Sequence, residues 1–355
     1  MQESLKLISG EVERVLKSSA FPEKIEPEFL RCAVRDYPLR GGKRLRPAVL
    51  IWSCGLFGGS LERALYPACA AEVFHNWTLV HDDIIDDDDF RRGVKSCHRS
   101  LGDYGRGNYG LDEPGAAAFG LNFALLAGDL QQGWANSLLL ESVRHGVSAE
   151  LVMSLMERLQ NYVNRELITG EALDVELSLR NPLTVRPAEV ERMFELKTGV
   201  LLRYCAESGA MIALNDVAGG SGEVKTLGRL AMAVAVAFQL RDDYLGIFGD
   251  EAKFGKPIGS DLSEGKITLL LLKSLENLPE SGRSELLGSL GRPCYSGKEL
   301  NRVRELMADS GAVDFVQKRE AELSSAALGW LGELPDNEYN QYWRELINYL
   351  LHREK

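Results

Sequence analysis

Two acidic segments, far apart in the chain, each lie beside an apolar stretch of helical character. The first is His81-Asp82-Asp83-Ile84-Ile85-Asp86, followed by three more aspartates and by Arg91-Arg92. The second is Gln239-Leu240-Arg241-Asp242-Asp243. Carboxylates this close repel one another, by roughly 0.2–0.5 kcal/mol for each i,i+4 pair on a helix. A fold tolerates them beside its core where a cation binds, and Mg²⁺ prefers carboxylate and phosphate oxygens as ligands.

Helical periodicity dominates the rest of the sequence, and alternating β-branched runs are scarce. We therefore expect residues 1–355 to form one all-α domain, a mostly antiparallel helix bundle. Residues 94–117 are rich in Gly, Ser, Asp and Asn and are predicted to form a long loop or an insertion. The predicted helices span residues 3–19, 26–37, 47–56, 62–86, 118–144, 149–178, 187–214, 223–248 and 264–277, with two or three more between 298 and 355.

Composition narrows the class of protein. A hydrophobic fraction of 45% is sufficient for a large core, and a net charge of −11 argues against nonspecific nucleic-acid binding. The six cysteines are scattered without a CxxC spacing, which indicates reduced thiols rather than a zinc site. No apolar run approaches the roughly 20 residues needed to span a bilayer. We expect a cytoplasmic protein without a transmembrane segment.

The first acidic segment places its functional groups on one helix face. Asp82 and Asp86 are four residues apart, so their carboxylates point the same way, and His75 lies two turns earlier on that face. A solvated acidic helix end is the alternative, but it would not need the adjacent arginine pair. Asp87 to Asp89 are predicted to lie past the helix end and to be simply solvated.

The second acidic segment follows the run Leu230 to Phe238, whose small and apolar residues predict a buried helix. Gln239 shares the helix face of Asp242 and Asp243. Ionised groups at the mouth of a buried helix must be paired or metal-bound. An internal ion pair with Arg241 is the alternative.

Several cations lie elsewhere in the chain. The turn Gly41-Gly42-Lys43-Arg44-Leu45-Arg46 could hold an anion with side chains and backbone N–H groups. Lys197-Thr198, Lys256 and Lys266 are weak signals when taken singly. No nucleophile–base pair and no Walker-type loop stands out, so metals and bound phosphates must supply the chemistry.

Taken together, these segments resemble the trans-prenyltransferases, the head-to-tail isoprenyl diphosphate synthases. The resemblance runs from about residue 38 to 275. It rests on a series of motifs in the family's order, namely GGKRLRP, HNWTLVHDDIIDDDDFRRG, LLAGD, ELKTG, QLRDD and GKPIGSDLSEGK. It implies an all-α bundle with a central active-site cleft, usually a homodimer.

The resemblance also implies a reaction and a set of roles. An allylic diphosphate (dimethylallyl, geranyl or farnesyl) would ionise with the help of Mg²⁺, three ions for each active site, and isopentenyl diphosphate would then attack the cation. The residues with implied roles are Asp82, Asp86 and Asp242 as Mg²⁺ ligands, Asp83 and Asp243 as supporting carboxylates, Arg91, Lys197, Thr198, Gln239, Lys256 and Lys266 for the allylic diphosphate, and Lys43, Arg46, His75 and Arg92 for isopentenyl diphosphate.

The sequence departs from the family pattern in two places. The second acidic motif usually reads DDxxD, but glycine occupies the third acidic place, at Gly246. Direct metal ligation from that position is therefore in doubt, although Asp250 is near in sequence. The second departure is the length of the 94–117 segment.

Residues before the first motif bear on product length. Trp77 and Thr78 lie five and four residues before Asp82, and a bulky group one turn below a metal site would act as a floor for the growing chain. By the resemblance, an aromatic residue there accompanies short products. We expect geranylgeranyl diphosphate, with farnesyl diphosphate second. Phe74 or a partner subunit is the alternative floor.

Three other functions would use some of the same residues. An HD-type metal phosphohydrolase would use His75 and His81, but the chain has only five histidines. A non-catalytic prenyltransferase subunit typically lacks an acidic motif or its lysines, which this chain keeps. A terpene cyclase has no second diphosphate to engage Lys43, Arg46 and Arg92.

Overall fold

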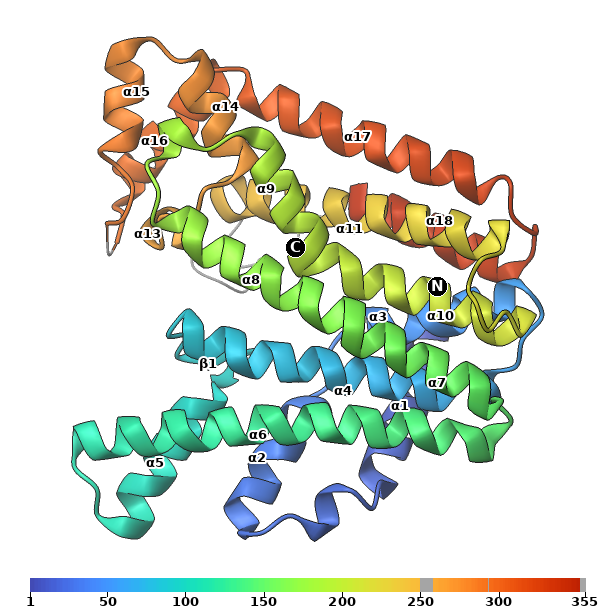
Figure 1. Ribbon diagram of the computed structural model, residues 1–355. Coiled ribbons are helices and arrows are strands. Elements are labelled where there is room, and N and C mark those ends of the chain that lie inside the picture. The colour runs from blue at the N-terminus through green and yellow to red at the C-terminus, as the bar shows by residue number, and fades with distance from the viewer. Residues whose placement is uncertain (250–257, 293, 352–355) are drawn as a thin grey trace. The chain divides into compact units, whose positions relative to one another are not determined.

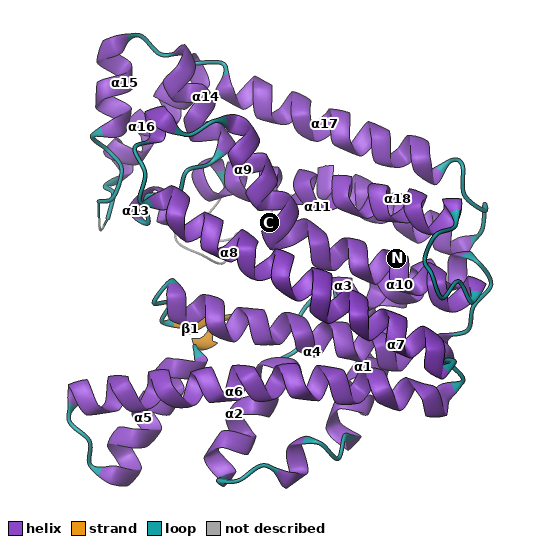
Figure 2. Ribbon diagram, viewed as in Figure 1, coloured by secondary structure: helices purple, strands orange, loops and turns teal. Residues whose placement is uncertain are grey.

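The computed structural model describes residues 1–249, 258–292 and 294–351, which form two compact units. The first unit comprises residues 1–157 and 205–224, and the second comprises residues 158–204 and the chain from residue 225 onward. Both units are helical, and within the described residues the strands are confined to one short hairpin (Figure 2). The prediction of an all-α fold is confirmed.

The first unit packs around two long neighbouring helices, α4 and α6, which lie side by side (Figure 1). The apolar face of α4 buries Ala68, Val73 and Phe74. The elements of this unit are α1 (Gln2–Ser18), η1 (Pro22–Lys24), α2 (Glu28–Leu39), α3 (Leu45–Leu56), α4 (Leu61–Ile85), β1 (Phe90–Arg91), β2 (Val94–Lys95), α5 (Cys97–Tyr109), α6 (Glu113–Glu141), η2 (Ser142–His145), α7 (Ala149–Glu157) and the second part of α10 (Val200–Leu214).

The predicted loop over residues 94–117 is wrong. This segment holds β2, the helix α5 and the start of α6. Gly102 within the segment and Gly120 just after it permit close helix packing: a Cβ on Gly102 would lie 3.1 Å from the Ala116 carbonyl oxygen, and one on Gly120 would lie 2.2 Å from the His98 carbonyl oxygen. The segment is therefore helical for most of its length, and the alternative of an insertion stays a prediction.

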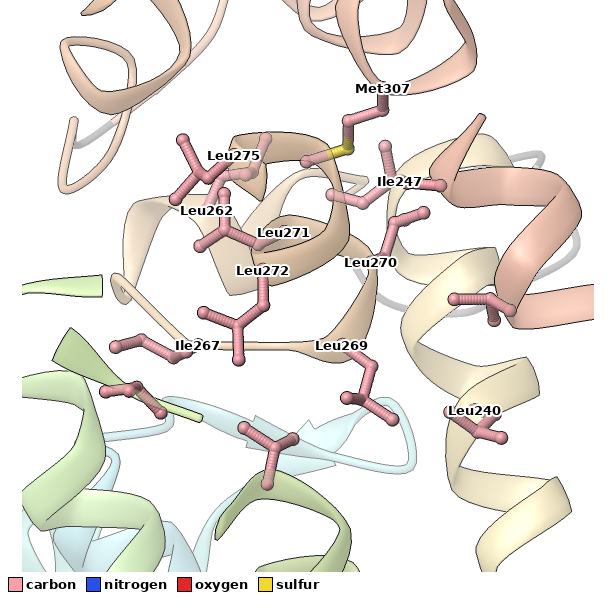
Figure 3. Close-up of a cluster of buried hydrophobic side chains, with 14 of the residues drawn as sticks. Leu240, Ile247, Leu262, Ile267, Leu269, Leu270, Leu271, Leu272, Leu275 and Met307 are labelled. Carbon is pink, nitrogen blue, oxygen red and sulfur yellow. The ribbon is translucent and has the colours of Figure 1, made fainter. Parts of the chain in front are cut away.

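The second unit has its own apolar core. Ile247 from α11 and Met307 from α16 join the leucines of α14 and Leu262 in one buried cluster (Figure 3). The elements of this unit are η3 (Arg158–Asn164), α8 (Arg165–Ser178), η4 (Pro182–Thr184), α9 (Pro187–Phe194), η5 (Glu195–Gly199), the first part of α10, α11 (Gly222–Phe248), α13 (Ser260–Ser263), α14 (Leu269–Asn277), α15 (Glu280–Leu287), α16 (Gly297–Asp309), α17 (Ala312–Leu331) and α18 (Glu338–Leu351).

Two predicted helices contain a wider turn. Residues 149–178 and 187–214 are helical as predicted, but η3 and η5 within them are π-helical. Such segments are rare and are frequently found at functional sites. The second of them, Glu195–Gly199, carries Lys197 and Thr198.

Candidate active site

The first acidic motif lies at the C-terminal end of α4. Asp82 and Asp86 are partly exposed, whereas Asp83 is buried. The helix ends at Ile85, and Asp87 has a left-handed backbone conformation with φ of 55°. The prediction that Asp87 to Asp89 lie beyond the helix is confirmed. Asp87 and Asp89 are exposed, and Arg99 pairs with them at 2.9 Å and 2.7 Å.

Asp83 belongs to a buried network. It accepts hydrogen bonds from the Tyr37 hydroxyl and from Arg91, whose Nε lies 2.6 Å from Oδ1. Arg91 also pairs with Asp88 at 3.2 Å and lies 3.6 Å from Asp82. Burial raises the pKa of the Asp83 carboxyl in spite of the arginine. Asp83 thus fixes the side chain of Arg91, and Arg91 also lies near the carboxylate of Asp82.

Cations predicted for isopentenyl diphosphate gather in the same unit. Arg46 Nη1 lies 2.9 Å from His75 Nε2, and because arginine can only donate, this ring nitrogen is the acceptor. Burial lowers the pKa of His75 well below its ordinary value, and the charges of Arg46 and Arg92 lower it further. The imidazole is therefore neutral near pH 7. Lys43 is exposed on the adjoining turn.

Arg92 lies against that turn. It donates a hydrogen bond to the Gly41 carbonyl oxygen, and a Cβ on Gly42 would lie 2.9 Å from its Cζ atom. Gly42 has φ of 129°, so the turn requires glycine both for its backbone and for space. Burial lowers the pKa of Arg92, as it does for Arg46. The structure brings Arg46, His75 and Arg92 together, as predicted.

The residues predicted to set chain length lie on two faces of α4. Trp77 is buried, and its ring meets the rings of Phe74 at 4.9 Å and His81 at 5.7 Å. Thr78 is only partly buried, and its hydroxyl donates to the His75 carbonyl oxygen at 2.8 Å. Of Trp77 and Thr78, Trp77 has the larger and more buried side chain, and its ring packs directly against Phe74.

In the second unit, the π-helical segment η5 presents Lys197 to α8. Its Nζ lies 2.9 Å from Glu171 and 2.6 Å from Asp174. A Cβ on Gly170 would lie 2.3 Å from the Lys197 backbone nitrogen, so α8 and η5 are in close contact. Glu171 and Asp174 were not predicted. The signal available in the sequence was their spacing of three residues on one helix face.

Thr198, Gln239 and Asp243 form a chain of hydrogen bonds. The Thr198 hydroxyl donates to Gln239 Oε1 at 3.2 Å, and Gln239 Nε2 donates to Asp243 Oδ1 at 2.9 Å. Asp242 is partly exposed and Asp243 is buried, both near the end of α11. Arg241 lies 3.9 Å from Glu320 on α17 and over the Tyr244 ring.

Asp243 lies among other carboxylates. Its pKa is raised well above the ordinary value by burial and by the charges of Asp261, Asp242 and Asp174. Its Oδ2 atom is buried and has no hydrogen-bond partner within the described residues. Asp261 was also missed by the sequence reasoning. A Cβ on Gly246 would lie 2.8 Å from Asp261 Oδ2, so this carboxylate occupies the space of the absent third acidic side chain.

The lysines after the second motif are only partly described. Lys266 pairs with Glu264 at 2.8 Å. Lys256 and Asp250 lie outside the described residues.

The donor sets fit Mg²⁺. The orphaned Oδ2 atom of Asp243 and the mutual repulsion of the nearby carboxylates suit the binding of a divalent cation, which would satisfy both. Mg²⁺ is usually bound by one or two carboxylates together with water and substrate phosphates. Within the described ranges, no three His, Cys, Asp or Glu side chains are grouped as a metal site by themselves.

The fold and these sites together define a class of enzyme. Two acidic motifs with cations beside them, on an all-α scaffold, are suited to binding diphosphate esters together with divalent metal ions.

Comparisons with known proteins identify the family. The polyprenyl synthetase family model matches residues 27–307. The chain is 32% identical over 354 residues to a geranylgeranyl pyrophosphate synthase of Geoglobus acetivorans, covering 100% of this chain and 98% of the relative. It is 32% identical to a geranylfarnesyl diphosphate synthase of Aeropyrum pernix, covering 93% of this chain and 96% of the relative.

A solved structure agrees. The geranylgeranyl pyrophosphate synthase of Corynebacterium glutamicum, complexed with isoprenyl diphosphate and magnesium, matches with a TM-score of 0.85 and 28% identity over 99% of each chain. The chain belongs to the polyprenyl synthetase family and is a prenyl diphosphate synthase, a transferase. These relatives favour this activity over the HD-type phosphohydrolase, the non-catalytic subunit and the terpene cyclase.

Among the residues that the structure describes, no helix is both long enough and apolar enough to cross a bilayer.

Proposed function

We propose that this enzyme condenses isopentenyl diphosphate head-to-tail with an allylic diphosphate to give geranylgeranyl diphosphate. The observation that carries the choice of product is the match of the whole chain to a geranylgeranyl pyrophosphate synthase. Farnesyl diphosphate is the second choice, supported by the buried Trp77 close to the first acidic motif.

The proposed metal ligands are Asp82, Asp86 and Asp242, for three Mg²⁺ ions in each active site. Bound Mg²⁺ would neutralise the charge of the allylic diphosphate and help it to depart. Asp83 contributes by holding Arg91, with which it shares a buried ion pair. Asp243 supports the second motif through Gln239.

The allylic diphosphate is bound by Arg91, Lys197, Thr198, Gln239 and the lysines 256 and 266. Lys197 is already fixed between two carboxylates, so its ammonium group is held in place before substrate arrives. Cations fixed where negative charge develops lower the barrier to ionisation, and such stabilisation is often the largest catalytic contribution.

Isopentenyl diphosphate is bound by Lys43, Arg46, His75 and Arg92. Neutral His75 accepts a hydrogen bond from Arg46 at Nε2, so its Nδ1–H is a donor for a phosphate oxygen. The reaction then proceeds as follows. The allylic C–O bond breaks with its electron pair on the departing diphosphate, the isopentenyl double bond attacks the cation, and the released diphosphate accepts the proton lost from carbon.

A homodimer is the proposed assembly. Leu121 and Leu125, one turn apart on α6, are 41% and 40% exposed, so they offer two adjacent apolar side chains to a second copy of the chain. A Leu121→Arg/Leu125→Arg variant should run as a monomer in analytical ultracentrifugation. Location in the cytoplasm stays a prediction that rests on the six free cysteines.

The function is tested by incubating the purified chain with isopentenyl diphosphate, Mg²⁺ and each allylic diphosphate in turn. The products are dephosphorylated and their alcohols are separated by chromatography. A twenty-carbon alcohol is the expected main product. Its absence with every starter would refute the proposal, whereas a fifteen-carbon alcohol would correct only the chain length.

A further inference from the structure

Arg44 stands between Lys43 and Arg46 in the basic turn, and by sequence alone it is as suited to binding an anion as they are. In the structure, however, Arg44 is buried, whereas Lys43 is exposed. Arg44 is 3% exposed and adopts a left-handed backbone conformation, with φ of 49°. A non-glycine residue in this conformation is uncommon and strained. Tertiary contacts must therefore hold it there.

Those contacts join three helices of the first unit. The Arg44 guanidinium donates to the Glu72 carboxylate on α4 and, at 2.5 Å, to the Pro38 carbonyl oxygen near the end of α2. Arg44 itself is the N-cap of α3. Asn76, fully buried on α4, donates to the Glu72 carbonyl oxygen at 2.7 Å and to its carboxylate at 3.3 Å. The Glu72 side chain is therefore held in place from two sides.

Arg46 contacts His75 at 2.9 Å, and the buried Glu72 carboxylate belongs to the residue one turn before His75 on the same helix, α4. The charge of Glu72 raises the pKa of both Arg46 and Arg92, in opposition to burial. An unneutralised Glu72 would compete with a diphosphate for these two arginines, because opposite charges attract strongly where water is excluded. Arg44 supplies the neutralising charge.

We propose that Arg44 is a positioning residue for the isopentenyl diphosphate site, occupying Glu72 so that Arg46 and Arg92 stay available to the substrate. This inference rests on the proposed assignment of Arg46 and Arg92 to that substrate. By this proposal, Lys43 and Arg46 of the turn bind the substrate, whereas Arg44 binds Glu72.

The test uses two single variants and their combination, Arg44→Met, Glu72→Gln and Arg44→Met/Glu72→Gln. Arg44→Met should raise KM for isopentenyl diphosphate by about tenfold or more, because breaking a buried ion pair leaves an uncompensated charge. KM for the allylic diphosphate should change less than about twofold, within the scatter of independent sites. The double variant, which has no uncompensated carboxylate, should recover most of the lost isopentenyl diphosphate affinity.

A purely structural role for Arg44 predicts other results. Both KM values would then rise together, and the double variant would be no better than Arg44→Met alone, which would overturn the proposal. If Arg44→Met does not fold, KM for isopentenyl diphosphate of the double variant and of Glu72→Gln tests the proposal. Glu72→Gln should leave KM for isopentenyl diphosphate unchanged or lower it, and an increase of about tenfold would overturn the proposal.

Arg46→Met serves as the reference variant. If it leaves KM for isopentenyl diphosphate unchanged, the assignment of the site itself is wrong. If it raises that KM while Arg44→Met does not, only the role of Arg44 is wrong.

Discussion

Oδ2 of Asp261 lies 2.8 Å from the point that a Cβ atom on Gly246 would occupy. These residues belong to different helices, Gly246 to α11 and Asp261 to α13, but they share one space beside Asp243, whose pKa Asp261 helps to raise. The glycine in the third acidic place is therefore matched by a carboxylate from another segment. The second motif lacks its third acidic side chain at Gly246, and Asp261 supplies a negative charge in that space instead.

Restoring the family's usual aspartate should consequently harm this enzyme. Gly246→Asp should lower kcat/KM by about tenfold or more, because overpacking costs about 1–3 kcal/mol and a further carboxylate adds repulsion. Gly246→Asp/Asp261→Gly, which moves the carboxylate to the usual place, should regain part of the activity. Steady-state rates over a Mg²⁺ titration measure both. A fully active Gly246→Asp enzyme would show that the space between residue 246 and Asp261 can hold a second carboxylate, which would contradict this prediction.

Asp82 and Asp83 should differ in the effect of removing them, although they are neighbours. Asp83→Ala removes a partner of Arg91 and of Tyr37 inside the fold, and breaking a buried pair costs about 3–5 kcal/mol of unfolding free energy. Asp82→Ala should change stability by less than about 1 kcal/mol, as for partly exposed charges, and should abolish most activity. Urea unfolding combined with an activity assay separates the two. Equal loss of stability in both variants would contradict the distinction.

Trp77→Ala should lengthen the product. The substitution removes a buried ring that packs on Phe74 and His81, which opens space below the first acidic motif. Because Trp→Ala in a core costs about 3–5 kcal/mol, the assay should be run at reduced temperature. Chromatography of the dephosphorylated alcohols gives the spectrum. Trp77→Phe, which keeps an aromatic ring, is the matched control, and an unchanged spectrum in Trp77→Ala would place the floor elsewhere.

His75 should make the folded state sensitive to acid. Its pKa is held well below the ordinary value of 6.5 by burial and by neighbouring arginines, so the unfolded chain binds the proton first. The contribution to stability is complete above pH 6.5 and is lost as the pH falls from there toward the lower folded value. His75→Gln should show a smaller loss of unfolding free energy than the wild type between pH 7.5 and about pH 5.5, close below the ordinary histidine pKa. Identical pH profiles would mean that His75 is not buried in its neutral form.

Much of the fold followed from periodicity. The helix that carries Asp242 was predicted over residues 223–248 and spans Gly222–Phe248, because its apolar residues recur around a continuous buried surface. The segment 94–117 was missed because its glycines were interpreted as loop residues. Gly102 and Gly105 instead bring α5 close to α6, where a Cβ on Gly105 would lie 3.0 Å from the Phe119 ring. Composition alone does not distinguish a glycine that ends a helix from one that allows close packing.

In the candidate site, too, local features followed from the sequence and long-range contacts did not. The spacing of Asp82 and Asp86 is local, so the sequence predicted their shared face. The partners that decide what Asp83 and Lys197 do, Tyr37 and Asp174, lie far away in the chain. Such pairings depend on how helices pack, which no single stretch of sequence specifies.

The π-helical turn at Glu195–Gly199 makes the directions of Lys197 and Thr198 depend on residue count. A π turn takes in one residue more than an α turn, so losing one residue there would let the helix rewind regularly. Because the π turn absorbs that residue, the α-helical segments on either side would keep their orientation, and the side chains within the turn would change direction. Deleting a single residue there would therefore redirect Lys197 away from Glu171 and Asp174 without altering any other amino acid, and would remove a proposed diphosphate ligand while keeping the rest of the scaffold.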